Sequence, residues 1–155
     1  MEDLPLFIDD ELANKLYLRI QNYLPQNRHI SGLSNRFRFS KYVKGGKFAL
    51  HQDGIYQDPN NGHRSFMTLN IFLNDDYTKC EAFGYEAQLR RSWVYTGGET
   101  DFFDGESLGQ VSNRRTAYPK VGRGALFYRE IFHRGNKVTD GVKYLLRTDV
   151  MSPIT

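Results

Sequence analysis

The chain contains a single cysteine, Cys80, among 155 residues, and it lacks any long apolar run. One cysteine excludes an intrachain disulfide and a structural zinc site built from several thiolates, and it is typical of a reducing compartment. No segment approaches the ~20 apolar residues that a membrane helix needs. The first residues, MEDLPLF, are acidic rather than leader-like. We therefore expect a soluble, cytoplasmic protein without a membrane partner.

The chain also lacks a strong excess of either charge. Its 21 Lys and Arg residues oppose 18 Asp and Glu residues, which gives a net charge of +3. This mild surplus permits an acidic partner without requiring one. Proline and tryptophan are scarce, whereas aromatic residues make up 14% of the chain and glycine occurs 14 times. This mixture favours strands and turns, and the length suits one domain, which we expect to span residues 1–155.

The sequence pattern predicts one helix followed by many short strands. The helix is expected from Phe7 to Leu24, with Asp9 or Asp10 as its cap and Pro25 as its end. Further along, short apolar and alternating segments are separated by turn residues. The expected strands are 35–42, 48–53, 64–73, 98–103, a basic strand near 114–115, 125–128 and 142–150. Roughly eight short strands with one flanking helix predict a mainly β, antiparallel jelly roll.

His51 and Asp53 are candidate metal ligands one residue apart on an expected strand. Side chains at positions i and i+2 of a strand project to the same face, so the imidazole and the carboxylate can bind one ion together. His133 is the candidate third ligand. Two histidines and one carboxylate with open positions match the facial triad of non-haem Fe(II) oxygenases. From these ligands alone, a catalytic zinc site remains open, and we expect His29 and His63 to be solvated.

Two longer motifs surround these candidates. Residues 42–53 follow the pattern Y-x-x-G-x-x-F-x-x-H-x-D, and residues 133–143 follow H-x-G-x-x-V-x-x-G-x-K. Both motifs resemble the two halves of the active site in 2-oxoglutarate- and Fe(II)-dependent dioxygenases of the prolyl 4-hydroxylase-like group, and the likeness extends from Asn35 to Met151. The resemblance implies a double-stranded β-helix fold, Fe(II) and 2-oxoglutarate as cofactors, O2 as co-substrate and ascorbate as a supporting reductant.

The resemblance also implies how 2-oxoglutarate is held. Lys143 matches the lysine that binds the far carboxylate in the family, and Arg147 is the second choice because it lies on the same face of the strand. Tyr42 matches the tyrosine that hydrogen-bonds the same carboxylate, and Thr68 is expected to face the same cavity. One departure is Phe72, which stands where some relatives carry a second tyrosine.

The resemblance implies a hydroxylase that couples 2-oxoglutarate decarboxylation to C–H hydroxylation. Asp53 favours this outcome, because halogenating relatives have Ala or Gly at that position. The segment of about 76–96 is inserted relative to the family pattern, and segments of this length are often binding loops or lids; the alternative is a packed hairpin or short helix. We expect a peptide or protein substrate of prolyl type. A nucleic-acid-modifying or small-molecule oxygenase, motivated partly by Arg90 and Arg91, and a non-catalytic metal-binding jelly roll remain the alternatives.

Overall fold

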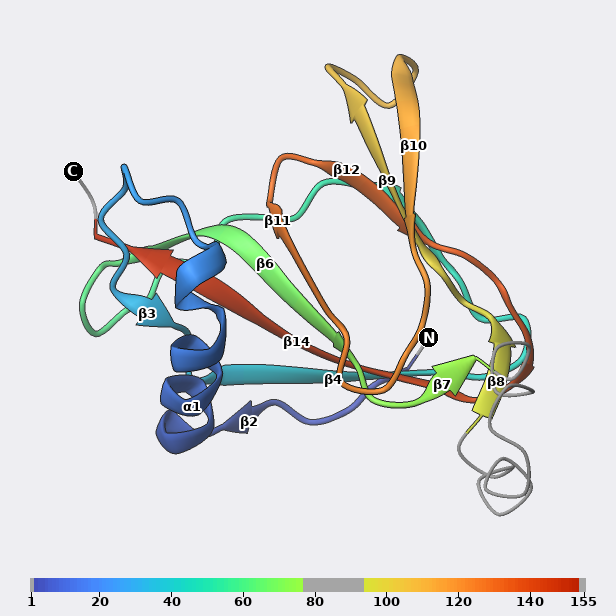
Figure 1. The fold of residues 1–155 in the computed structure, drawn as a ribbon, viewed down its shortest axis with the longest axis horizontal. Helices are drawn as coiled ribbons and strands as arrows, with labels where there is room; N and C mark the ends of the chain where they lie inside the picture. Colours follow the sequence, from blue (N-terminus) through green and yellow to red (C-terminus); the bar gives the residue numbers. More distant parts are fainter. Residues whose placement is uncertain (1, 77–93, 154–155) are drawn as a thin grey trace.

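The strand β14 (Lys143–Ser152) lies at the centre of the larger of two facing sheets in the computed structural model, which describes residues 2–76 and 94–153 (Figure 1). The strand order of this sheet is β1-β4-β14-β6-β11, with β2 paired to β4 and β3 paired to β14. Its other strands are β1 (Glu2–Asp3), β2 (Phe7–Ile8), β3 (Gly32–Leu33), β4 (Arg36–Tyr42), β6 (Arg64–Phe72) and β11 (Gly124–Tyr128).

A second sheet of four strands covers one face of the larger sheet in the order β10-β9-β12-β5, and a third, small sheet has the order β13-β8-β7. Their strands are β5 (Phe48–His51), β7 (Asp75–Asp76), β8 (Val94–Gly97), β9 (Thr100–Gly105), β10 (Val111–Ala117), β12 (Phe132–Gly135) and β13 (Val138–Gly141). Among the described strands only β7 and β8 pair in parallel. The predicted antiparallel jelly roll is therefore confirmed.

The predicted N-terminal helix is present but shorter than expected. It is α1 (Asp10–Ile20), followed by a 3₁₀ turn, η1 (Gln21–Tyr23), and the Asp9 carboxylate caps it by accepting from the Leu12 amide at 2.8 Å. The prediction that the helix begins at Phe7 is wrong, because residues 7–8 pair with β4 instead. No helix in residues 2–76 and 94–153 has the length and apolar character that a membrane crossing needs.

The central strand β14 has one face toward α1 and the other toward the smaller sheet. Leu146 packs with Ala13 of the helix and with Phe37, and all three are buried. Leu145, on the opposite face, packs with Tyr42 and lines a cavity between the sheets. Because successive strand residues alternate between faces, every second residue of β14 reaches this cavity. The fold thus gives the interior of the jelly roll a row of positions open to chemistry.

Candidate metal centre and cavity

His51 and His133 are brought together by the pairing of β5 with β12. The two histidines are direct register partners, and the centroids of their rings lie 4.2 Å apart. Asp53 follows the end of β5, where its backbone N–H donates to the carbonyl of Arg129 at 2.9 Å. The prediction that strand β5 extends to Asp53 is therefore wrong, since the strand ends at His51. The carboxylate nevertheless lies beside both imidazoles.

Each imidazole has its Nδ1 atom fixed by a backbone carbonyl. His51 Nδ1 lies 2.7 Å from the carbonyl oxygen of Ala49, and His133 Nδ1 lies 2.9 Å from that of Ile131. A carbonyl oxygen only accepts, so Nδ1 carries the proton in both rings and Nε2 keeps a lone pair. Burial lowers the pKa of His133 despite the nearby Asp53 carboxylate, which favours the neutral ring that metals bind.

The Asp53 carboxylate is buried and ionised. Its Oδ1 lies 3.5 Å from His51 Nε2, and its Oδ2 lies 3.7 Å from His133 Nε2. Burial by itself raises the pKa of Asp53, but contact with His51, the charge of Arg147 and the hydroxyl of Thr68 outweigh it and lower the pKa to about 2. The carboxylate is therefore charged across the physiological range.

These three side chains fit a divalent cation. One ligand atom from each of His51, Asp53 and His133 lies within 4.8 Å of the other two. Two neutral Nε2 lone pairs and a carboxylate are all acceptors, so they converge without a hydrogen atom to share between them. A cation bound among them would resolve this repulsion, and two nitrogens with one carboxylate oxygen suit Fe(II).

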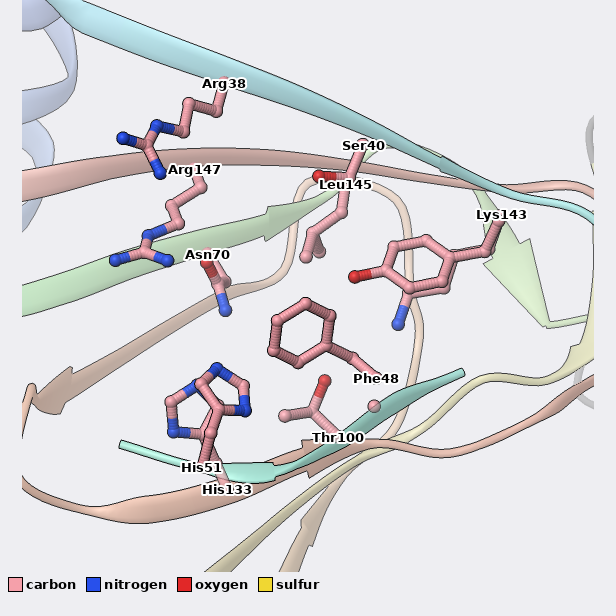
Figure 2. A pocket seen from close by; sticks show the side chains of 12 residues that line it. Arg38, Ser40, Phe48, His51, Asn70, Thr100, His133, Lys143, Leu145 and Arg147 are labelled. Carbon is pink, nitrogen blue, oxygen red and sulfur yellow. The ribbon is translucent and has the colours of Figure 1, made fainter. Parts of the chain in front are cut away.

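A cavity of about 130 Å³ extends from the imidazoles between the two sheets (Figure 2). Figure 2 shows His51 and His133 on the smaller sheet, with Phe48 between them and Lys143. The strands of the larger sheet supply the opposite wall. The full lining is Arg38, Ser40, Tyr42, Phe48, His51, Asn70, Thr100, His133, Gly135, Lys143, Leu145 and Arg147.

Lys143 lies on the cavity wall with only 1% of its surface exposed. Its ammonium donates to the carbonyl of Gly98 at 2.7 Å and lies 4.9 Å from the centre of the Tyr42 ring. Gly98 has a φ of +71°, and a Cβ there would approach the Lys143 side chain to 3.1 Å, so glycine leaves room for the lysine. Burial lowers the pKa of Lys143 from 10.5 to about 8, against the opposing effect of Glu99.

Arg147 and Thr68 are both directed to Asp53. The Arg147 guanidinium lies 3.0 Å from Asp53 Oδ1 and 3.6 Å from the carboxylate of Asp149. The Thr68 hydroxyl donates to Asp53 Oδ2 at 2.7 Å, and Thr68 is not among the residues that line the cavity. Both residues therefore orient a candidate metal ligand, whereas the sequence pattern had suggested contacts with the far carboxylate of 2-oxoglutarate.

Four polar residues of the cavity wall were not singled out from the sequence: Arg38, Ser40, Asn70 and Thr100. Thr100 follows the Gly-Gly-Glu turn that also supplies the partner of Lys143, so this turn was the available signal. For the other three, the signal was their even spacing from Tyr42 and Phe72 on alternating strands.

The remaining candidates fall outside the centre. His29 is exposed and His63 is half-buried, and neither belongs to the group of potential ligands found among the described residues. Most of the insertion, with Arg90 and Arg91, lies outside the described residues. Its last part is different: Tyr95 is 1% exposed and packs with Tyr42, Phe72, Val138 and Leu145.

Comparisons with known proteins agree with this geometry. A profile of the 2OG-Fe(II) oxygenase superfamily matches residues 37–148. No curated protein matches the sequence significantly. The viral collagen prolyl hydroxylase of Paramecium Bursaria Chlorella virus-1, solved with 2OG, superposes with a TM-score of 0.61 at 18% identity, over 99% of this chain and 80% of that chain.

Two further solved structures share the fold over part of their length. The prolyl-4-hydroxylase of Pseudomonas putida gives a TM-score of 0.57 at 15% identity, over 90% of this chain and 62% of that chain. A prolyl 4-hydroxylase of Phytophthora capsici gives a TM-score of 0.54 at 19% identity, over 97% of this chain and 47% of that chain. At these identities the structural likeness establishes the fold alone.

Proposed function

Because the chain belongs to the 2OG-Fe(II) oxygenase superfamily, and is accordingly a dioxygenase that uses Fe(II) and 2-oxoglutarate, we propose that it hydroxylates a C–H bond of a peptidyl, prolyl-type substrate. The observation that carries the proposal is one cavity with His51, Asp53 and His133 at one end and the buried Lys143 on its wall. Such a cavity offers both a metal site and a cation for an anionic co-substrate.

In this proposal His51, Asp53 and His133 hold the Fe(II) ion. When bound, the iron supplies the site at which O2 is activated, and the overall reaction converts 2-oxoglutarate, O2 and a substrate C–H into succinate, CO2 and C–OH. The two backbone carbonyls that fix Nδ1 keep the Nε2 atoms aimed at the metal position. Arg147 and Thr68 hold the Asp53 carboxylate in place. The presence of a carboxylate at position 53 favours hydroxylation over halogenation.

Lys143 is the proposed partner of the far carboxylate of 2-oxoglutarate, with Tyr42 and Thr100 beside it on the cavity wall. Within the described residues Lys143 forms no ion pair, and its carbonyl partner does not neutralise its charge. A buried ammonium without a carboxylate is costly. An anionic ligand that enters the cavity would compensate this cost and gain a charge-assisted hydrogen bond.

A peptide substrate is supported by the kind of enzyme that shares this fold, since all three structures compared above are named as prolyl hydroxylases. The alternative of a nucleic-acid substrate gains little from the described surface. Arg115 on β10 already pairs with Asp104, and the net charge of +3 provides few cations for tracking phosphates.

The proposal is tested by incubating the purified protein anaerobically with Fe(II), adding 2-oxoglutarate and air, and offering a panel of proline-containing peptides. Mass spectrometry should detect the gain of one oxygen atom on a peptide, together with succinate. The His51→Ala variant serves as the inactive control and Arg114→Ala as the active one, because Arg114 is exposed on β10. Succinate formation that is never accompanied by peptide oxidation, while a nucleotide or metabolite is oxidised, would contradict the peptidyl assignment.

A further inference from the structure

Three polar side chains lie in one row across the larger sheet, next to the metal centre. Arg147 on β14 is the register partner of Arg38 on β4 and of Asn70 on β6. All three line the cavity, and Figure 2 shows them together on the wall opposite His51 and His133. The row at Lys143 and Tyr42 lies four residues away along the same strands, about 13 Å between backbones at the usual strand rise.

The charges of this row are unequally compensated. Arg147 pairs with Asp53 and Asp149. Arg38 is exposed, and no described carboxylate forms an ion pair with its guanidinium. The two negative charges of 2-oxoglutarate would be matched by Lys143 and by the net charge of a divalent metal bound to Asp53. Arg38 therefore keeps an unmatched positive charge when metal and co-substrate are counted.

Asn70 adds an unpaired polar group to the same row. Its side chain is 7% exposed, and its Oδ1 atom finds no hydrogen-bond partner within the described residues. Buried amide oxygens are rarely left without a partner, because the loss of solvation is not repaid. Asn70 also faces the cavity. An unmatched guanidinium and an unpaired amide on one wall point to a ligand that carries a negative group and hydrogen-bonding groups.

We propose that Arg38 and Asn70 form a subsite for a carboxylate of the prime substrate, placed beside the metal centre and separate from the co-substrate cation at Lys143. The inference rests on the proposed function, and it narrows the substrate to a carboxylate-bearing unit. Guanidinium groups bind carboxylates through two parallel hydrogen bonds, which gives them orientation as well as affinity. The carboxylate comes either from an acidic side chain next to the hydroxylated residue or from the α-carboxylate of a terminal or free residue.

The test measures binding, so it does not depend on turnover. The protein is loaded with Zn(II) and the inert co-substrate analogue N-oxalylglycine, and peptide probes are titrated in by calorimetry. One pair of probes is acetyl-Gly-Pro with a free carboxylate and with an amide terminus. The other pair is acetyl-Asp-Pro-Gly-amide and acetyl-Asn-Pro-Gly-amide. Each pair differs only in one carboxylate, and the two pairs separate the two sources.

In the unaltered protein, one of the two carboxylate probes should bind about tenfold more tightly than its neutral twin, as a charge-assisted contact predicts. The difference should disappear in Arg38→Ala and persist in Arg114→Ala, which removes the same charge from an exposed position on β10. Arg38→Lys should restore part of the preference. The inference is overturned if neither carboxylate probe is preferred, if no probe binds, or if the preference survives in Arg38→Ala.

The co-substrate provides the remaining control. Should Arg38→Ala weaken the binding of N-oxalylglycine as much as Lys143→Ala does, Arg38 belongs to the co-substrate site and the inference is wrong, although the proposed function stands. Failure of the unaltered protein to convert 2-oxoglutarate to succinate with Fe(II) would instead count against the proposed function. The two failures are therefore distinguishable.

Discussion

At the scale of single residues, the most unusual feature is an ammonium group buried without a carboxylate partner. Lys143 is 1% exposed and donates to a carbonyl oxygen, and its burial lowers its pKa to about 8. Arg147 is more exposed and already paired with Asp53 at 3.0 Å. The two cations that the sequence offered for the far carboxylate of 2-oxoglutarate thus differ sharply in their surroundings, and only Lys143 is poised to gain a new partner.

The first prediction separates these two cations. Lys143→Ala should raise the 2-oxoglutarate concentration needed for half-maximal turnover about 10- to 100-fold, because it removes a charge-assisted contact of about 1.5–3 kcal/mol. Its affinity for Fe(II) should change little. Arg147→Ala should show the reverse, with weaker metal binding, since Asp53 loses an orienting partner. If Arg147→Ala raises the 2-oxoglutarate requirement while Lys143→Ala is mild, the assignment of the two cations is reversed.

The second prediction concerns pH. Lys143 has a pKa of about 8 in the free protein, and a bound dianion favours the charged ammonium, so binding requires proton uptake above that pH. The affinity for N-oxalylglycine should be nearly constant from pH 7 to 8 and fall by up to about tenfold per pH unit above it. Calorimetry across this range measures the effect. A Lys143→Ala variant should lose this dependence, and an unchanged slope in that variant would contradict the explanation.

The same shift affects stability with the opposite sign. Lys143 has a lower pKa in the folded protein than its usual value of 10.5, so between pH 8 and 10.5 the unfolded chain binds more protons than the folded one. The contribution of this residue to the free energy of unfolding therefore rises with pH across that window. Burial of the charge destabilises the fold below pH 8, in the absence of a ligand.

At the scale of elements, the inserted segment begins and ends at one small sheet. Its flanking strands β7 and β8 pair in parallel, and Tyr95 of β8 is part of the core with Tyr42 and Phe72. The aromatic residues expected to contact a substrate thus include one that is structural. Tyr95 must be kept in any experiment that removes the insertion.

The third prediction follows from these anchors. Replacing residues 77–93 by a glycine-serine linker on the order of ten residues should spare Fe(II) and 2-oxoglutarate binding, because a linker of that length spans the short parallel crossover and Tyr95 stays in place. Hydroxylation of the peptide substrate should fall strongly. Calorimetry and mass spectrometry measure the two properties separately. Normal peptide hydroxylation by the replaced form would mean that the insertion takes no part in substrate binding.

The elements also show how far sequence patterns reach. The alternation of apolar residues predicted β4, β6 and β14 closely, and Asp9 was among the two caps expected for α1. The helix start was misjudged because Phe7 and Ile8 have the same apolar character in a strand as in a helix, and pairing with β4 decides between them. Such pairing depends on residues far apart in the chain.

The same limit applies to the site. Local motifs predicted the grouping of His51, Asp53 and His133, and they placed Lys143 and Tyr42 on one cavity wall. They could not predict that Arg147 pairs with Asp53, because that contact joins β14 to the loop after β5 across the two sheets. Asn70 and Arg38 were missed for a similar reason: their common row is visible only once the register of three strands is known.

At the scale of the whole molecule, the two facing sheets divide the chemistry between them. The smaller sheet carries both imidazoles, and the larger sheet carries the cations Lys143, Arg147 and Arg38. The metal site therefore forms only when the sheets are packed together, with Asp53 joined to the larger sheet by Thr68 and Arg147. Metal binding should accordingly stabilise the packed sheets against unfolding by mass action.

The most direct test of this account is the stoichiometry of Fe(II) binding, measured by anaerobic calorimetry on the unaltered chain and on single histidine variants. The unaltered protein should bind one Fe(II) ion, and the variants His29→Ala and His63→Ala should do the same, because neither side chain lies in the centre. His51→Ala and His133→Ala should lose measurable binding. Binding of one ion with unchanged affinity by either of these last two variants would contradict the assigned metal centre.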